Sequence, residues 1–421
     1  MAIGQKASGS DGLGMPTVQS IVEQTLAGQN LDGRRVLVIV PDHTRTAPVD
    51  MVFRALHERI GGVVASLDVM IALGTHPPMS EEAICGRLGM TMEERRSHFT
   101  KVGFLNHEWN NPDALAEIGT IPASTIAELT DGLFQMDVPV EINKRVLEYD
   151  HLMIIGPVFP HEVVGFSGGN KYFFPGVGGP RILNFFHWLG AVVTNAKIIG
   201  RQKTVVRKVV DAAGAMIQKP KTCFCMVVGD SKEMAGLYAG SPEDAWEDAS
   251  EHSRQIHIVY KKKPFKTVLS VAPAMYDELW TAGKAMYKLE PVVADGGELI
   301  IYAPHLKEVS ETHGAIIRRI GYHVRDYFLK QWDQFKDMPW GVLAHSSHVK
   351  GSGIFEDGIE TPRVTVTIAS QIPESVCREI NLGYRDPATI NIDDFTNRED
   401  QGVLYVPKAG ERLFLLEGDH E

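Results

Sequence analysis

Short apolar runs alternate along this chain with stretches in which apolar residues recur at helical spacing. The nearly continuous apolar runs are typical of strands buried on both faces, and they predict strands at 35–40, 67–73 and 151–155. The helical spacing predicts helices at 51–59 and 80–88. Ser80 is a suitable N-cap for the second helix, because Glu81 and Glu82 follow it in the first turn. This alternation predicts the α/β class, with an N-terminal doubly wound, Rossmann-like sheet.

A second block of strands and helices begins near residue 265. Strands are predicted at 267–271, 298–302 and 364–369, and helices at 276–288 and 312–331. The basic run 260–264 separates the two blocks and resembles a solvated hinge. We therefore expect a cofactor-binding and catalytic domain at 1–262 and a smaller α/β domain at 263–421 that closes on substrate. The active site would lie in the cleft, and the segment 412–416 could pack back on the first domain.

The composition restricts the class of partner. Of the 421 residues, 44% are apolar and 23% are charged, and the net charge is −11. An acidic chain is a poor match for nucleic acid or an anionic membrane, although a local basic pocket can still bind a small anion. The first residues lack the apolar core of a signal peptide, and no apolar run is long enough to span a bilayer, so we expect a cytoplasmic protein. Cys223 and Cys225 occupy a strand-like run and are expected to pack in the core.

Polar side chains follow the predicted strands at their carboxyl ends. In open α/β sheets, ligands bind beyond those ends, so residues that are far apart in the sequence are expected to converge there. The candidates are Asp42, Thr44, Arg45, His76, His161 and Lys171.

The segment 161–176 contains the richest chemistry. Its Ser167-Gly168-Gly169 turn could let backbone N–H groups approach a phosphate closely. Lys171 could pair with that phosphate or act as an amine nucleophile, and the residues alone leave both roles open. A second imidazole follows at His187. One lysine between two histidines indicates chemistry on a bound, phosphorylated small molecule.

Four motifs in order resemble those of the lactate racemase family, the nickel-pincer-nucleotide enzymes. They are Asp42-His43-Thr44-Arg45, Gly74-Thr75-His76, the run from His161 through Ser167-Gly168-Gly169-Asn170-Lys171 to Gly176, and Asn184-Phe185-Phe186-His187. The resemblance covers most of the chain.

The resemblance implies a cofactor. It is the pyridinium-3-thioamide-5-thiocarboxylic acid mononucleotide, joined covalently to Lys171, whose nickel His187 would bind. Asp42, Thr44 and the Ser167-Gly168-Gly169 turn would hold the nucleotide. Enzymes that synthesise the cofactor and insert nickel would then be partners, beside the small-molecule substrate.

The resemblance also implies inversion at C2 of a 2-hydroxy acid by reversible hydride transfer. His76 and His161 would be the acid–base pair, one for each enantiomer, because imidazole titrates near neutrality. Arg45 would bind the substrate carboxylate, and Lys284 would also reach the substrate. Lactate-active members carry Tyr-Gln where this chain has Trp280-Thr281, so these two residues are expected to contact a different 2-hydroxy acid.

Two other functions fit the same α/β arrangement. A nicotinamide-dependent 2-hydroxyacid dehydrogenase would share the fold, although no Gly-x-Gly-x-x-Gly fingerprint follows the first strand. A non-catalytic protein that binds a phosphorylated metabolite or nickel nucleotide would need neither His76 nor His161 as a base. His345 and His348 could bind a metal on a helix, but without a nearby carboxylate a surface loop is the favoured prediction. For His107 only a structural hydrogen bond is predicted.

Overall fold

The computed structural model describes residues 1–419 and divides into two compact units built from interleaved segments. Unit 1 comprises residues 1–159, 166–183 and 205–256, and unit 2 comprises 160–165, 184–204 and the chain from 257 onward. The chain passes from unit 1 to unit 2 for the last time between residues 256 and 257, whereas a domain boundary was expected at 262. The two earlier excursions were not predicted, and they place His161 and His187 in unit 2, whereas Lys171 stays in unit 1.

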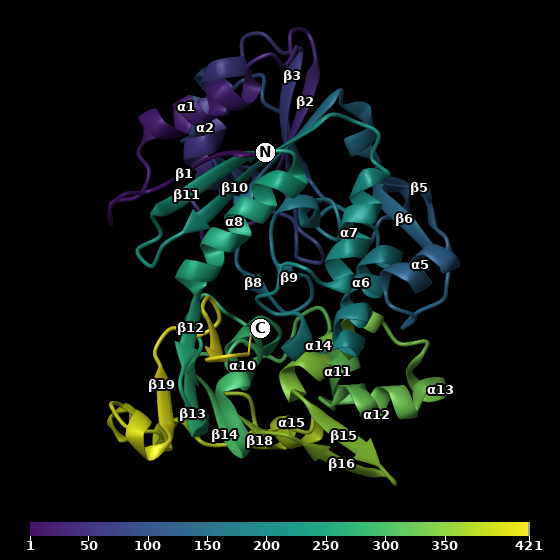
Figure 1. Cartoon of the computed structure of the whole chain (residues 1–421), viewed down its shortest axis with the longest axis vertical. Coiled ribbons are helices and arrows are strands. Elements are labelled where there is room, and N and C mark those ends of the chain that lie inside the picture. Colours follow the sequence, from purple (N-terminus) through teal and green to yellow (C-terminus); the bar gives the residue numbers. More distant parts are fainter. Residues whose placement is uncertain (420–421) are drawn as a thin grey trace. The chain divides into compact units, whose positions relative to one another are not determined.

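Unit 1 is built on a seven-stranded sheet with the order β1-β11-β10-β7-β2-β3-β4. The five strands from β10 to β4 run parallel, whereas β11 pairs antiparallel with both β10 and β1 at one edge (Figure 1). The strands are β1 (Ile3–Lys6), β2 (Arg35–Pro41), β3 (Ser66–Ala72), β4 (Phe104–Asn106), β7 (His151–Pro157), β10 (Lys221–Val228) and β11 (Met234–Gly240).

The helices of unit 1 bury their apolar faces against this sheet. One core joins alternate strand residues such as Val38, Val69 and Ile155 to apolar residues of α1, α2 and α3. Ser80 caps α3 as predicted, since its hydroxyl accepts a hydrogen bond from the backbone of Ala83. The helices are α1 (Met15–Leu26), α2 (Val49–Ile60), α3 (Glu81–Arg87), α4 (Met92–Ser97), α5 (Ala123–Leu129), α7 (Val205–Ala215) and α8 (Pro242–His257); β5 (Leu115–Ile121) and β6 (Val138–Asn143) form a separate hairpin.

Unit 2 contains a five-stranded parallel sheet with the order β18-β17-β14-β13-β19. Its strands are β13 (Phe265–Val271), β14 (Val293–Ala303), β17 (Thr365–Ser370), β18 (Gly383–Tyr384) and β19 (Val403–Val406). The late segment expected to pack back on the first domain is β20 (Leu413–Leu416). It pairs with β12 (Ile258–Lys261), which lies before the boundary expected at 262 but belongs to unit 2. An antiparallel hairpin joins β15 (Gly353–Glu356) to β16 (Ile359–Pro362).

The predicted helices of unit 2 exist but are broken. The helix expected at 276–288 is two single turns, α9 (Leu279–Ala282) and α10 (Lys284–Tyr287), that meet at Gly283. The helix expected at 312–331 stops at Gly321, whose φ of 72° is not helical. It becomes α11 (Gly314–Ile320) and α12 (Arg325–Lys330), followed by α13 (Trp332–Phe335). The remaining helices are α14 (Trp340–Lys350) and α15 (Glu374–Glu379), while α6 (Pro180–Val193) begins in unit 1 and continues in unit 2.

One sequence prediction is wrong. His345 and His348 do not lie in a surface loop but in α14, where Ser346, Ser347 and His348 are all buried. The polar residues of this segment suggested exposure to solvent, yet most residues of the helix are buried. By contrast, Cys223 and Cys225 are buried on β10 with their sulfur atoms 3.4 Å apart, as core packing predicts.

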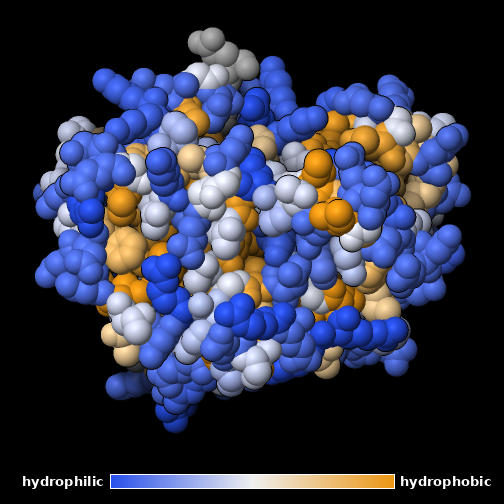
Figure 2. All heavy atoms as spheres, turned by 90° about the horizontal axis from the view of Figure 1, so that it is seen from below, coloured by the Kyte–Doolittle hydropathy of each residue, from blue (hydrophilic) through white to orange (hydrophobic). Residues whose placement is uncertain are grey.

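The mixed α/β class is therefore confirmed, whereas the doubly wound Rossmann-like arrangement stays a prediction. Within residues 1–419, no helix has both the length and the apolar content needed to cross a bilayer. The face seen in Figure 2 is mostly hydrophilic, with its apolar residues in separate patches.

Candidate active site

A buried carboxylate and an imidazole meet at the carboxyl ends of β2 and β3. Asp42 follows β2, and its Oδ2 lies 2.5 Å from Nδ1 of His76, which follows β3. The other oxygen, Oδ1, accepts hydrogen bonds from the backbone N–H and the hydroxyl of Thr44 at 3.1 and 2.7 Å. Because the carboxylate accepts a hydrogen bond from Nδ1–H, the neutral ring keeps the lone pair of Nε2 available as a base.

The surroundings of Asp42 keep its carboxylate ionised. The side chain is 3% exposed, and burial alone would raise its pKa. The hydrogen bond and charge of His76, with smaller effects of Thr44 and Arg45, outweigh burial and hold the pKa well below its usual value. The side chain of His76 is 37% exposed, so the ring is partly accessible to solvent while its Nδ1 is held by Asp42.

Arg45 is half-buried beside this pair, and its positive charge contributes to the lowered pKa of Asp42. Within the described part of the chain, no ion pair involves its guanidinium. A partly desolvated guanidinium of this kind is suited to bidentate binding of a carboxylate or phosphate.

Lys171 lies on a single turn of 3₁₀-helix, η3 (Gly169–Tyr172), that follows the predicted Ser-Gly-Gly turn. Gly168 and Gly169 have φ angles of 89° and 58°, which non-glycine residues rarely adopt. The hydroxyl of Ser167 donates to the carbonyl of Pro157 and accepts from the backbone N–H of Phe159, at 3.1 and 2.9 Å. The side chain of Ser167 therefore closes this loop.

Three further residues hold the same loop and were not predicted. Arg207 of α7 is buried and donates to the carbonyls of Phe166 and Gly168, and its guanidinium lies 3.8 Å from the ring centre of Trp246. The indole N–H of Trp246 donates to the carbonyl of Ser167 at 2.9 Å. Asn170, which is 1% exposed, donates to Asp211 and Glu243. The position of Arg207 on the apolar face of its helix, next to Val206, was the only sequence signal.

Hydrogen bonds tie the His76 loop to the Lys171 loop. The backbone N–H of Gly74 donates to the carbonyl of Gly176 at 3.0 Å. His107 Nε2 donates to the carbonyl of Gly178 at 3.0 Å and its Nδ1 accepts from Asn143 at 3.2 Å, so the structural hydrogen bond predicted for this buried histidine is confirmed. Unit 1 thus brings together Asp42, Thr44, Arg45, His76 and the loop of Lys171.

His161 lies in unit 2, on β8 (Pro160–His161), which pairs with β9 (Gly165–Phe166). The ring is 7% exposed, and Nδ1 accepts a hydrogen bond from the backbone N–H of Val163 at 3.1 Å. The carboxylate of Glu162 lies 3.3 Å from the same nitrogen. When Nδ1 accepts from Val163, Nε2 carries the proton and the neutral ring has no free lone pair. When Nδ1 instead carries the proton and faces Glu162, the lone pair of Nε2 can accept a proton.

His187 lies on the part of α6 that belongs to unit 2. The next residue, Trp188, stacks on Trp332 with the ring centres 5.4 Å apart, and the amide of Asn184 accepts from the backbone of Gly341 at 2.8 Å. These contacts fix the helix that presents the imidazole.

Lys284 begins α10 in unit 2, and its ammonium lies 5.0 Å from the ring centre of Tyr276. Trp280 stacks on His345 with the ring centres 3.8 Å apart and the planes at 13°, and Thr281 beside it is half-buried. Unit 2 therefore contains His161, His187, Trp280, Thr281 and Lys284.

The comparisons with known proteins agree with the motifs. The sequence model of the lactate racemase N-terminal domain matches residues 16–199, which include every motif quoted above except the Trp280–Lys284 segment. Lactate racemase from Thermoanaerobacterium thermosaccharolyticum is 25% identical over 67% of this chain, and that from Lactiplantibacillus plantarum is 22% identical over 68%. The part of the chain that contains these motifs is therefore similar to the N-terminal domain of lactate racemases.

Solved structures of similar proteins extend the likeness to nearly the whole chain. A crystal structure of a Thermotoga maritima protein is 33% identical, covers 97% of this chain and 99% of its own, and superposes with a TM-score of 0.87. The lactate racemase apoprotein of T. thermosaccharolyticum is 17% identical with a TM-score of 0.70, covering 94% of this chain and 92% of its own, so it shows the fold alone. The matches to the two curated lactate racemases span 61% and 65% of their lengths.

The residues present fit the cofactor that the lactate racemase family implies. The loop presents Lys171 next to Asn170, whose buried Oδ1 has no hydrogen-bond partner within residues 1–419. No group of three or more His, Cys, Asp or Glu side chains within residues 1–419 could hold a metal. A nickel ion would therefore need most of its ligands from the cofactor, and one imidazole such as His187 would complete them.

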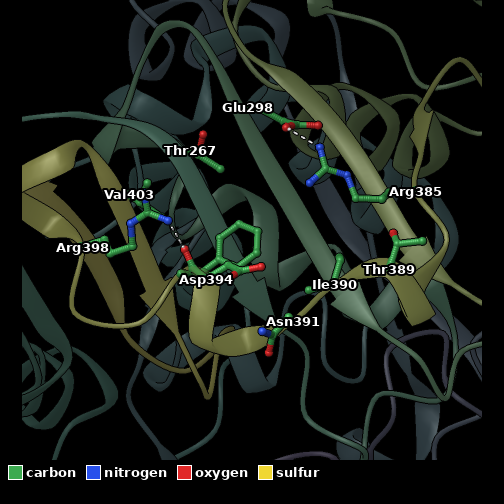
Figure 3. A pocket seen from close by; sticks show the side chains of 10 residues that line it. Thr267, Glu298, Arg385, Thr389, Ile390, Asn391, Asp394, Arg398 and Val403 are labelled. Carbon is green, nitrogen blue, oxygen red and sulfur yellow. Dashed lines mark hydrogen bonds and ion pairs between the residues drawn. The ribbon is translucent and has the colours of Figure 1, made fainter.

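A pocket of about 340 Å³ in unit 2 contains none of these residues. Figure 3 shows that its two arginines already have partners: Arg385 pairs with Glu298 at 3.2 Å, and Arg398 donates to the backbone carbonyl of Asp394 at 2.8 Å. We assign it no role in the reaction.

Proposed function

We propose that this protein is a racemase or epimerase that inverts C2 of a 2-hydroxy acid, using a nickel-pincer nucleotide joined to Lys171. The observation that carries the proposal is the Asp42–His76 pair, because it gives a chain similar to lactate racemases a fixed imidazole base beside the loop of that lysine. The bound nucleotide would accept the hydrogen that leaves C2 together with its electron pair.

In this proposal each histidine transfers the proton of the 2-hydroxyl group for one enantiomer. His76 accepts that proton at Nε2, while Asp42 holds Nδ1–H and stabilises the imidazolium that forms. His161 serves the other enantiomer, and Glu162 stabilises its protonated ring. General acid–base groups of this kind contribute roughly 10²–10⁴-fold to a rate.

The remaining residues would bind and orient the substrate. The guanidinium of Arg45 would grip the substrate carboxylate, and the ammonium of Lys284 would add a second positive charge. His187 would bind the metal. Trp280 and Thr281 would contact the substituent at C2.

The proposal is tested by chiral chromatography of enantiopure 2-hydroxy acids incubated with protein co-expressed with cofactor-synthesis and nickel-insertion enzymes. We expect inversion of at least one acid, loss of inversion in both directions in His76→Gln and His161→Gln, and no inversion by protein expressed alone. Wild-type activity in the single-expressed protein, or activity that requires added nicotinamide, would overturn it.

A further inference from the structure

The buried helix α14 carries two imidazole nitrogens that nothing in the described structure satisfies. His345 and His348 are three residues apart and so share one helix face, and His348 is 5% exposed. Nδ1 of His345 and Nε2 of His348 are both shielded from solvent and have no hydrogen-bond partner. A buried polar atom without a partner is costly, so each of these nitrogens favours a hydrogen-bonding group that residues 1–419 of the protein do not supply.

The bonding of His345 decides what that group must offer. Its Nε2 lies 2.8 Å from the backbone carbonyl of Trp280, which can only accept, so Nε2 carries a proton. Burial keeps the ring neutral, since it lowers the pKa of His345 to about 3, an effect that the hydrogen bond to Trp280 only partly offsets. The buried Nδ1 is consequently an acceptor. It requires an O–H or N–H donor, and an ionised carboxylate has none.

Aromatic rings pack around His345. Trp280 stacks on His345, and His313 lies 4.4 Å from Trp280 between ring centres. Tyr322 is fully buried with its ring centre 5.7 Å from that of His345, and its hydroxyl also has no partner. Rings that surround a few unsatisfied polar atoms are typical of a small-molecule site.

The helix is also tied to the proposed metal ligand within unit 2. The N-terminus of α14 is anchored at Gly341 to Asn184, three residues before His187 on α6. The charges of Glu162 and His187 act on the pKa of His348, after burial, which lowers it to about 4. The cluster therefore lies within electrostatic range of His187 and of the residue next to His161.

We propose that His345 and His348 bind hydroxyl groups on the carbon chain beyond C2, so that the substrate is a polyhydroxylated 2-hydroxy acid rather than lactate. This inference rests on the proposed function and names its substrate class. The methyl group of lactate would leave both nitrogens unpaired. A second carboxylate would present no proton to Nδ1 of His345.

The experiment compares 2-hydroxy acids that differ only in the chain beyond C2: lactate, glycerate, threonate and malate. Inversion at C2 is measured with the loaded enzyme by chiral chromatography. We expect kcat/KM for threonate to exceed that for lactate and for malate by at least about 10²-fold, because a site built for hydroxyl groups rejects analogues that lack them. Equal or faster inversion of lactate or malate would overturn the inference.

Four variants test the two nitrogens. Leucine at either position removes the polar atom, whereas His345→Asn places an amide near Nδ1 and His348→Gln places one near Nε2. We expect the threonate-to-lactate ratio to fall about 10-fold in each leucine variant, through KM, and to recover substantially in the amide variants. His98→Gln, an exposed control, should leave the ratio unchanged. A ratio insensitive to both leucine variants would mean that water occupies this space.

Titration calorimetry of the cofactor-free protein with threonate and lactate separates this inference from the proposed function. Tighter binding of threonate that weakens in His345→Leu, without inversion of any acid by the loaded enzyme, would support the site and reject the racemase. Inversion with no preference for threonate in either assay would retain the racemase and reject the site.

Discussion

Nδ1 of His76 lies 2.5 Å from the buried carboxylate of Asp42, and the two residues are 34 positions apart in the sequence. The pairing fixes which nitrogen of the imidazole carries the proton and leaves the lone pair of the other, Nε2, available as a base. Asp42 thus acts through His76, as a positioning residue.

Replacing Asp42 with asparagine should remove most of the activity. The amide cannot stabilise the imidazolium that forms when His76 takes a proton, so we expect kcat to fall about 10²–10⁴-fold with KM changed less than about fivefold. Steady-state kinetics of the loaded enzyme provide the measurement, with the exposed Asp32→Asn as control. A large rise in KM with kcat retained would show that Asp42 binds substrate or cofactor instead.

The same carboxylate should make stability depend on acid pH. The folded state lowers the pKa of Asp42, so the unfolded chain binds the proton more readily. The carboxylate contributes its full stabilisation when the pH is above the pKa of Asp in the unfolded chain, about 4, and this stabilisation is lost as the pH falls below that pKa. The gap in urea midpoint between wild type and Asp42→Asn should be constant from pH 7 to 5 and shrink towards pH 3. A constant gap down to pH 3 would refute the assignment.

Arg45 should govern substrate affinity. Loss of a bidentate carboxylate contact in Arg45→Gln should raise KM about 10- to 100-fold, and Arg45→Lys should recover only part of it, because an ammonium cannot make both bonds. The exposed Arg59→Gln serves as control. A KM for Arg45→Lys equal to that of the wild type would show that the positive charge at this position suffices and that bidentate binding does not contribute.

Much of this arrangement follows from local sequence. Strands β2, β3 and β7 and the Ser80 cap were predicted because hydrophobic runs and capping residues act over a few positions. Placing Asp42 and His76 at the same sheet edge also followed from the strand order, but their direct bond depends on side-chain geometry across the loops.

Other features depend on packing that no local pattern reveals. The polar residues at 345–348 predict an exposed segment from sequence alone. In the structure Trp280 and Tyr322, which are distant in the sequence, pack against His345. The breaks at Gly283 and Gly321, and the excursions of the chain that carry His161 and His187 into unit 2, likewise arise from tertiary structure.

The placement of Lys171 depends on a close approach between Tyr172 and Gly156 of β7. A Cβ atom at position 156 would lie 2.0 Å from the Tyr172 hydroxyl oxygen, so Gly156→Ala must displace the ring that follows Lys171. We expect a loss of about 1–3 kcal/mol in stability together with reduced cofactor loading. Gly86→Ala, where the added methyl meets open space in a helix, should be neutral or slightly stabilising in chemical denaturation. Equal stability of the two variants would contradict the packing described.

The intact mass of the protein purified after co-expression with the cofactor-synthesis enzymes tests the central claim most directly. The account predicts a covalent adduct that peptide mapping places on Lys171, absent from Lys171→Ala and present in the exposed-lysine control Lys101→Ala. An unmodified Lys171 in a preparation that still inverts a 2-hydroxy acid, or the same adduct on Lys171→Ala, would contradict it.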